Sequence, residues 1–195
     1  MRVFLAGLFG GLMIFFAGFF SHQILGWGGR TIQTPKDLDK ARDSLVAELK
    51  EPGIHSLVPQ NRPEFATLPI DKQIAEMQKT TAQFIQGPNG YVIIAPPIDA
   101  TNGPKQILLE ALSNIISALI VAWIMTQIAP ISFLRRWMIV LAFGFVGWLS
   151  ISASQYLWYY FPAAFIRDEL FCALLEWGIA GLLIASIVRP RIATK

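Results

Sequence analysis

The stretch WLSISASQYLWYYFPAAFIRDELFCALLEW, residues 148–177, decides the fold of this chain. It starts in an apolar run, gathers Tyr and Trp over residues 156–160, passes Pro162 and the charged residues 167–169, and becomes apolar again. Trp and Tyr concentrate where membrane helices meet lipid head groups, and proline interrupts a helix. The stretch therefore predicts a helical hairpin at one membrane face, with Pro162 ending the incoming helix and Arg167, Asp168 and Glu169 remaining in water.

The composition of the whole chain also indicates a membrane protein. Of 195 residues, 54% are hydrophobic and only 15% are charged, whereas about a quarter of the residues of a soluble domain are charged. The net charge of +3 is spread over the ends and one short loop, so we expect no nucleic-acid partner. The single cysteine, Cys172, lies in an apolar run and is interpreted as a small buried residue.

Four apolar runs are long enough to cross a bilayer, which takes about 20 helical residues. We predict transmembrane helices over residues 1–27, 107–130, 137–161 and 168–188. The first run is longer than the apolar part of a signal peptide, and no small-residue cleavage site follows it, so we expect it to be an uncleaved span. The remaining segments are then a loop at 131–136, a turn at 162–167 and a tail at 189–195.

The basic residues predict the orientation of these spans. In a four-span arrangement Arg2, the Arg135-Arg136 loop, Arg189, Arg191 and Lys195 all fall on one side. Positive charge concentrates on the cytoplasmic side of membrane proteins. We therefore expect both termini, the 131–136 loop and the 189–195 tail in the cytoplasm, and the 162–167 turn outside it.

Residues 28–106 are polar and rich in proline, which predicts a small extracytoplasmic α+β cap. Thr34-Pro35 and Asp37 resemble a helix start, and leucines then recur at helical spacing up to Pro52-Gly53. We further expect a strand over 54–58, a short helix over 71–79, and a hairpin of 83–85 with 91–95 around a Gly87–Gly90 turn. The fold class expected is mainly α: an integral membrane four-helix bundle carrying this cap between the first and second spans.

Two further groups of residues are expected to serve the membrane helices. Glycines let neighbouring helices approach closely, and Trp and Tyr anchor helix ends at the interface. The expected packing positions are Gly7, Gly11, Gly18, Gly144, Gly147, Gly178 and Gly181, and the expected interfacial anchors are Trp27, Trp137, Tyr156, Trp158 and Tyr159.

Five strongly polar residues fall at membrane depth in the outer half of the spans: His22, Glu110, Asn114, Gln155 and Glu176. A charged side chain at mid-bilayer costs at least about 2.5–3.5 kcal/mol, so these groups should meet one another and avoid lipid. They are interpreted either as a structural clasp, in which His22 donates to Glu176 or Glu110, or as a pocket for a lipid-like or quinone-like molecule. The residues come from separate helices without metal-ligand spacing, so neither a metal site nor a cofactor is predicted.

Several stretches resemble a set of small bacterial inner-membrane proteins of uncharacterised function. They are the glycine-rich start ending in GFFSH, PGIHSLVP, GPNGYVIIAP, LLEALSNIISALIVAW, WLSISASQYLWYYFPAAF and EWGIAGLLIASIVRP. The resemblance implies a four-span protein of the bacterial inner membrane with a periplasmic cap, and it implies no activity. Similar sequences often carry glycine after the Trp158-Tyr159 pair, where this chain has Tyr160.

No catalytic constellation is recognisable in the sequence. The leading hypothesis is a non-enzymatic accessory or assembly subunit whose partners are membrane lipids and another membrane protein. The alternative is a binding or transport protein for an amphiphilic ligand at the outer leaflet. A membrane enzyme using His22 and the carboxylates is the least favoured hypothesis.

Overall fold

The structure, a computed structural model, describes residues 1–57, 63–99, 101–128 and 130–188 and divides into two units. The first unit comprises Met1–Gln33 and Asp99–Lys195, and the second comprises Thr34–Ile98. Helices dominate the described residues, and two short strands form their one sheet. The expected mainly α fold class is confirmed, and each unit is described separately below.

Four helices of the first unit are long and apolar enough to cross a membrane, which confirms the four predicted spans in length and composition. Helix α1 (Arg2–Phe19) continues into the π-helical segment η1 (Phe20–Ile24) and the 3-10 turn η2 (Gly29–Thr31). The other three are α4 (Asn102–Met125), α5 (Phe133–Trp158) and α6 (Ala163–Ile187). Each of these three begins before its predicted start.

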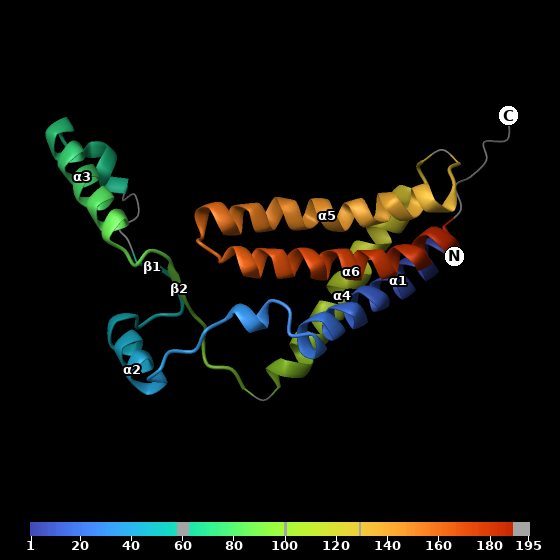
Figure 1. Cartoon of the computed structure of the whole chain (residues 1–195), viewed down its shortest axis with the longest axis horizontal. Coiled ribbons are helices and arrows are strands. Elements are labelled where there is room, and N and C mark those ends of the chain that lie inside the picture. The colour runs from blue at the N-terminus through green and yellow to red at the C-terminus, as the bar shows by residue number, and fades with distance from the viewer. Residues whose placement is uncertain (58–62, 100, 129, 189–195) are drawn as a thin grey trace. The chain divides into compact units, whose positions relative to one another are not determined.

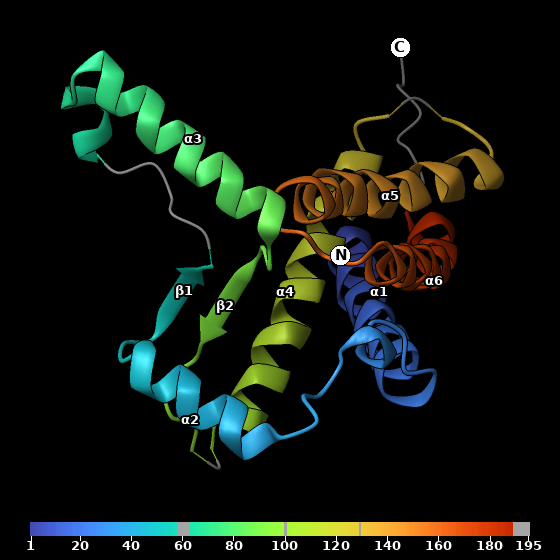
Figure 2. The ribbon, with the colours of Figure 1, turned by 60° about the vertical axis from the view of Figure 1, so that its left-hand side comes forward.

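The four helices pack in the order α4, α1, α6, α5, and α4 makes few contacts with α5. The expected bundle is therefore open on the side between α4 and α5. Figure 2 shows α1 between α4 and α6. The core lies near the end of the unit where α1 begins and α6 ends. It contains Ala6, Ile14, Ala118, Val121, Ala122, Met125, Val140, Ala180, Ile184 and Val188.

The N-terminus, the start of α5 and the end of α6 lie at the same end of the first unit (Figure 1). Arg136 joins two of these elements, because its Nε donates to the Ala185 carbonyl at 2.9 Å while its second nitrogen donates to the Ile131 carbonyl at 2.8 Å. An arginine at this point satisfies carbonyls that the end of a helix leaves unpaired. The predicted basic tail, with Arg189, Arg191 and Lys195, lies outside the described residues.

The turn between α5 and α6 differs from the prediction. Helix α5 ends at Trp158, and Pro162 caps the start of α6 with φ −60° and ψ 141°, so Pro162 begins the outgoing helix and does not end the incoming one. A proline fits there because its fixed φ suits the helix start and no N–H is needed. The chain reverses at Tyr160, whose φ is +60°, and the Phe161 N–H donates to the Gln155 carbonyl at 3.1 Å.

The backbone at Tyr160 carries a testable cost, because a left-handed φ is unfavourable for every residue with a Cβ. Tyr160→Gly should therefore be more stable than Tyr160→Ala by about 1 kcal/mol. Both variants lose the same ring, so their difference in thermal unfolding, measured in detergent, isolates the backbone effect. Equal stability of the two variants would show that this turn relaxes without strain.

In the second unit, helix α2 (Leu38–Glu48) is capped by Asp37, whose carboxylate accepts from the Lys40 N–H at 2.9 Å. The predicted start at Thr34 was therefore too early. An aspartate is a strong cap because its side chain accepts from the free N–H groups of the first turn. The predicted helix exists, but it is shorter than expected and ends at Glu48.

The predicted hairpin is wrong. Residues 83–85 belong to helix α3 (Ile70–Gln86), which is longer than the expected 71–79 helix. Strand β2 (Tyr91–Ile94) instead pairs antiparallel with β1 (Gly53–Ser56), which overlaps the expected 54–58 strand, in a register that places Gly53 opposite Ile94. The first unit also includes residues 28–33 and 99–106, which the prediction assigned to the cap.

Candidate ligand-binding cavity

A cavity of about 960 Å³ lies within the first unit, between η1, α1, α4, α5 and α6. All five residues of the predicted polar cluster line it: His22, Glu110, Asn114, Gln155 and Glu176. Pockets that hold small molecules measure roughly 300–1,000 Å³. The predicted residues therefore surround an open space large enough for a ligand and do not pack into a solid clasp.

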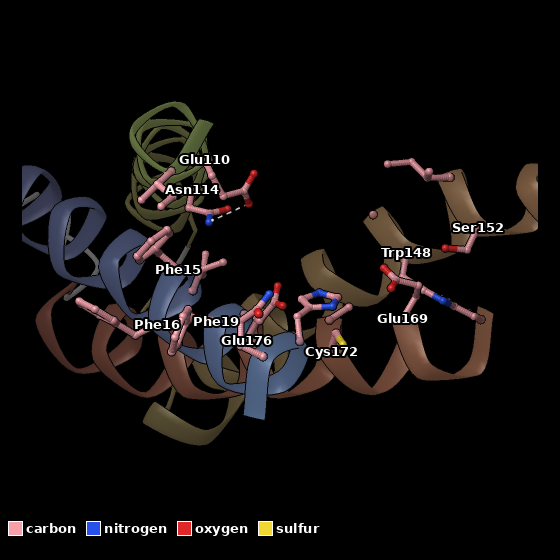
Figure 3. A pocket seen from close by; sticks show the side chains of 18 of the residues that line it. Phe15, Phe16, Phe19, Glu110, Asn114, Trp148, Ser152, Glu169, Cys172 and Glu176 are labelled. Atoms are coloured by element: carbon pink, nitrogen blue, oxygen red, sulfur yellow. Dashed lines mark hydrogen bonds between the residues drawn. The ribbon is translucent and has the colours of Figure 1, made fainter. Parts of the chain in front are cut away.

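The walls of the cavity differ in character (Figure 3). On α4, Asn114 donates to Glu110 Oε1 at 3.3 Å, one helical turn away. Trp148 and Ser152 project from α5 on the opposite side. Apolar side chains complete the lining: Ile14, Phe15, Phe16, Phe19, Ile107 and Ile151. The lining is thus amphiphilic, with aromatic and aliphatic surface beside a few polar groups.

Glu176 lies on α6 between these two walls (Figure 3). A Cβ on Gly18 would lie only 3.1 Å from Glu176 Oε1, so the glycine allows α1 to pass close to the carboxylate. Within the described part of the chain, Glu176 has no hydrogen-bond or ion-pair partner. Its position on a cavity wall leaves the carboxylate without tight apolar packing on one side, and an unpaired charge packed in hydrocarbon would be costly.

His22 does not make the predicted bond to Glu176 or Glu110. Its Nδ1 lies 3.1 Å from the Trp27 carbonyl oxygen instead. The chain turns back after η1 because Gly26 and Gly28 adopt φ of +66° and +76°, and the Trp27 N–H donates to the Ser21 carbonyl at 3.0 Å. The prediction was wrong because it assumed one straight helix through residue 27.

Sequence reasoning missed Glu169 and Cys172, which also line the cavity. Both stand on the face of α6 that carries Glu176, at the helical spacing 169, 172 and 176. The prediction had assigned Glu169 to water and Cys172 to an apolar contact. Helix α6 begins at Ala163 and not at 168, so residue 169 lies nearly two turns inside the helix.

Asp168 is also not in water, because its side chain is 0% exposed. Arg30 forms a bidentate ion pair with it, with Nε to Oδ2 at 2.7 Å and a second nitrogen to Oδ1 at 2.8 Å. The Gly28 N–H donates to the same carboxylate at 3.3 Å, and Arg167 contacts it at 3.3 Å. The pair ties the segment after α1 to α6 beside the cavity.

The predicted packing glycines differ in their surroundings. Gly7, Gly11, Gly144 and Gly181 lie against neighbouring helices, since an added Cβ would come within 3.1 Å or less of atoms of Leu119, Ile115, Trp177 and Trp137 respectively. A Cβ added to Gly178 would lie 3.8 Å from a side-chain atom of Leu141, and a Cβ added to Gly18 would face the Glu176 carboxylate. Gly147 was wrongly predicted as a contact position: nothing described lies within 4 Å of its added Cβ, and it lines the cavity.

The predicted aromatic anchors also differ in their surroundings. Trp137 donates from Nε1 to the Gly178 carbonyl at 2.9 Å, and Trp27 packs on Phe171 with ring centroids 5.8 Å apart. These two rings therefore contribute to packing against α6. Tyr156, Trp158 and Tyr159 are about half exposed or more, as side chains at a lipid interface would be.

The arrangement can receive a molecule that is apolar along one part and polar at one end. Hydrogen-bond acceptors dominate the polar part of the cavity lining, because this part contains the carboxylates of Glu110, Glu169 and Glu176. Among the described lining residues there is no lysine or arginine to balance them. Comparison of the chain with protein families, curated proteins and solved structures gives no match, so its resemblance to small bacterial inner-membrane proteins stays a prediction.

Proposed function

We propose that this chain is an integral membrane protein that binds an amphiphilic molecule in the cavity between α4 and α5. The observation that supports the proposal most directly is the amphiphilic lining of an open space of about 960 Å³. A purely structural polar clasp would instead be filled by its own side chains, since protein interiors are close-packed.

The charges of the lining narrow the class of ligand. Three carboxylates and no described lysine or arginine face the cavity, so an anionic head group would be repelled and a cationic or hydrogen-bond-donating one attracted. The rings of Phe15, Phe16, Phe19 and Trp148 offer surface for the apolar part of the molecule, and an aromatic face also attracts cations. The ligand proposed is therefore a lipid-like molecule with a cationic or donor head group.

A binding assay in neutral lipid nanodiscs tests this proposal. Two fluorescent probes with the same dodecyl chain are compared, one with a trimethylammonium head and one with a phosphate head, in the presence of a metal chelator. We expect the ammonium probe to bind at least about tenfold more tightly, which corresponds to about 1.4 kcal/mol. Equal affinity of the two probes would contradict the proposed ligand class.

Two variants connect the binding to the cavity. Glu110→Gln with Glu176→Gln should reduce the ammonium-probe affinity by about tenfold, since each carboxylate contributes through charge attraction. Gly147→Trp should abolish binding of the probe by filling the space, whereas Gly147→Ala should leave it nearly unchanged. Binding that survives Gly147→Trp would place the probe elsewhere on the protein.

A second candidate function is an accessory or assembly subunit, and one observation in the second unit favours it. Helix α3 exposes a row of apolar side chains, Ile70, Ile74, Met77 and Ile85, each at least 50% exposed. Ile74, Met77 and Ile85 also border a shallow groove. An exposed apolar row of this kind is typical of a helix that packs on a partner.

Gentle purification followed by native mass spectrometry separates the two candidates. A stoichiometric lipid-like adduct on an otherwise bare chain supports the binding function and contradicts the subunit function. A co-purifying protein that is lost in an Ile74→Glu, Met77→Glu variant supports the subunit function. The exposed Lys79→Glu variant, on the same helix, is the matched control for added negative charge.

A further inference from the structure

Three residues with metal-binding side chains meet at one end of the cavity. A ring nitrogen of His22, a carboxylate oxygen of Glu169 and the Sγ of Cys172 all lie within 4.8 Å of one another. Glu169 and Cys172 are three residues apart on one face of α6, and His22 comes from η1. Figure 3 shows Glu169 and Cys172 on the α6 wall of the cavity.

The hydrogen bond of His22 assigns the ring proton, and with it the metal-binding lone pair, to particular nitrogens. A carbonyl oxygen can only accept, so the Nδ1 that lies 3.1 Å from the Trp27 carbonyl carries the ring proton. The lone pair of the neutral ring is then on Nε2. Histidines that bind metals commonly donate their other N–H to a carbonyl or carboxylate, which fixes the tautomer and the ring orientation.

The charge around the cluster also favours a cation. Asp168 is neutralised by Arg30, but Glu169 forms no ion pair with any lysine or arginine of the described residues. The carboxylate of Glu176, one turn beyond Cys172, is likewise unpaired within that part of the chain. Uncompensated carboxylates in an apolar helical unit are costly, and a bound divalent cation would offset that cost.

We propose that His22, Glu169 and Cys172 bind a divalent transition-metal ion of the zinc class. Zinc prefers Cys sulfur, His nitrogen and carboxylate oxygen in a tetrahedral arrangement, and three protein ligands leave a fourth position for water or a ligand. That fourth position faces the cavity, because all three residues line it. Cys172 binds as the thiolate, so its thiol proton is released to solvent when the metal enters.

This site goes beyond the proposed amphiphile binding and does not depend on it. The α4 and α5 walls, with Glu110, Asn114 and Trp148, remain available to an amphiphile whether or not a metal is bound. The chelator in the nanodisc assay and the absence of the ammonium probe from the metal assay keep the two tests separate. Either proposal can fail while the other stands.

Cobalt titration of the full chain, purified in detergent and stripped with a chelator, tests the metal site. Co²⁺ bound to a thiolate gives an intense near-ultraviolet charge-transfer band, and Cys172 is the only cysteine in the sequence. We expect one Co²⁺ per chain, with a band that Zn²⁺ removes and that Cys172→Ser abolishes. His22→Ala and Glu169→Gln should each weaken Co²⁺ binding by about tenfold or more.

Matched controls come from the same residue types elsewhere. His55→Ala replaces the only other histidine, which lies in β1, and Glu76→Gln replaces an exposed carboxylate of α3. Both should bind Co²⁺ as the unmodified chain does. No band at excess Co²⁺, or a band unaffected by His22→Ala and Glu169→Gln, would overturn the proposal.

Thiol protection gives a second measurement that needs no substitution at Cys172. Zn²⁺ should slow alkylation of Cys172 by a small maleimide by about tenfold or more in the unmodified chain and not in His22→Ala. Equal protection in both proteins would also overturn the proposal, because the thiol would then bind zinc without His22.

Discussion

Arg30→Ala is expected to lower the midpoint of thermal unfolding by about 5–10 °C. The substitution leaves the Asp168 carboxylate, which is 0% exposed, without its bidentate partner. Removing one partner of a buried ion pair is much more destabilising than replacing both partners with apolar residues, since the remaining charge stays buried without a partner. Cys172 is 3% exposed and the only cysteine, so its reaction with a fluorogenic thiol dye during heating reports the unfolding.

Two further variants show whether the ion pair causes this loss. Arg167→Ala removes a longer, 3.3 Å contact of a side chain that is 56% exposed, and it should shift the midpoint little. The double variant Arg30→Ala, Asp168→Leu should recover part of the stability, because no charge is then left buried. If the double variant were less stable than Arg30→Ala alone, Arg30 would stabilise the unit through its packing and not through Asp168.

The parts of this fold that could be predicted depend on local sequence. The four spans follow from the length of the apolar runs, and helix α2 follows from the helical spacing of its leucines, although Asp37 and not Thr34 caps it. The polar cluster was placed by depth along each span, because burying a polar group in lipid is costly enough to bring such groups together. All five of its members do line one cavity.

The parts that could not be predicted depend on contacts between distant residues. Strand β2 pairs with β1 across the whole of α3, although a nearby turn signal suggested a local hairpin. The Arg30–Asp168 pair joins the end of the first span to the start of the last. Glu169 and Cys172 were missed for a related reason. The predicted helix start at 168 placed Glu169 at the water boundary, Cys172 was interpreted as an apolar core residue, and His22, which lies near both, belongs to another element.

Small residues within the spans set how closely the helices approach, and Gly11→Ala tests this directly. A Cβ on Gly11 would overlap the Ile115 Cα, so α1 and α4 must move apart. Alanine favours a helix over glycine by about 1 kcal/mol, but overpacking against backbone costs up to about 3 kcal/mol. We therefore expect a net loss of stability, seen as a lower unfolding midpoint in the thiol-dye assay.

Gly147→Ala is the matched control for this prediction, because it gains the same helix propensity in α5 and meets nothing described within 4 Å. It should be neutral or slightly stabilising, so the two alanine variants should shift the midpoint in opposite directions or differ by several degrees. If Gly11→Ala were as stable as Gly147→Ala, α1 and α4 would not be held in backbone contact, and α4 would be free to close against α5. In that case the cavity between α4 and α5 would not be a fixed feature of the unit, and the binding proposals would lose their geometric basis.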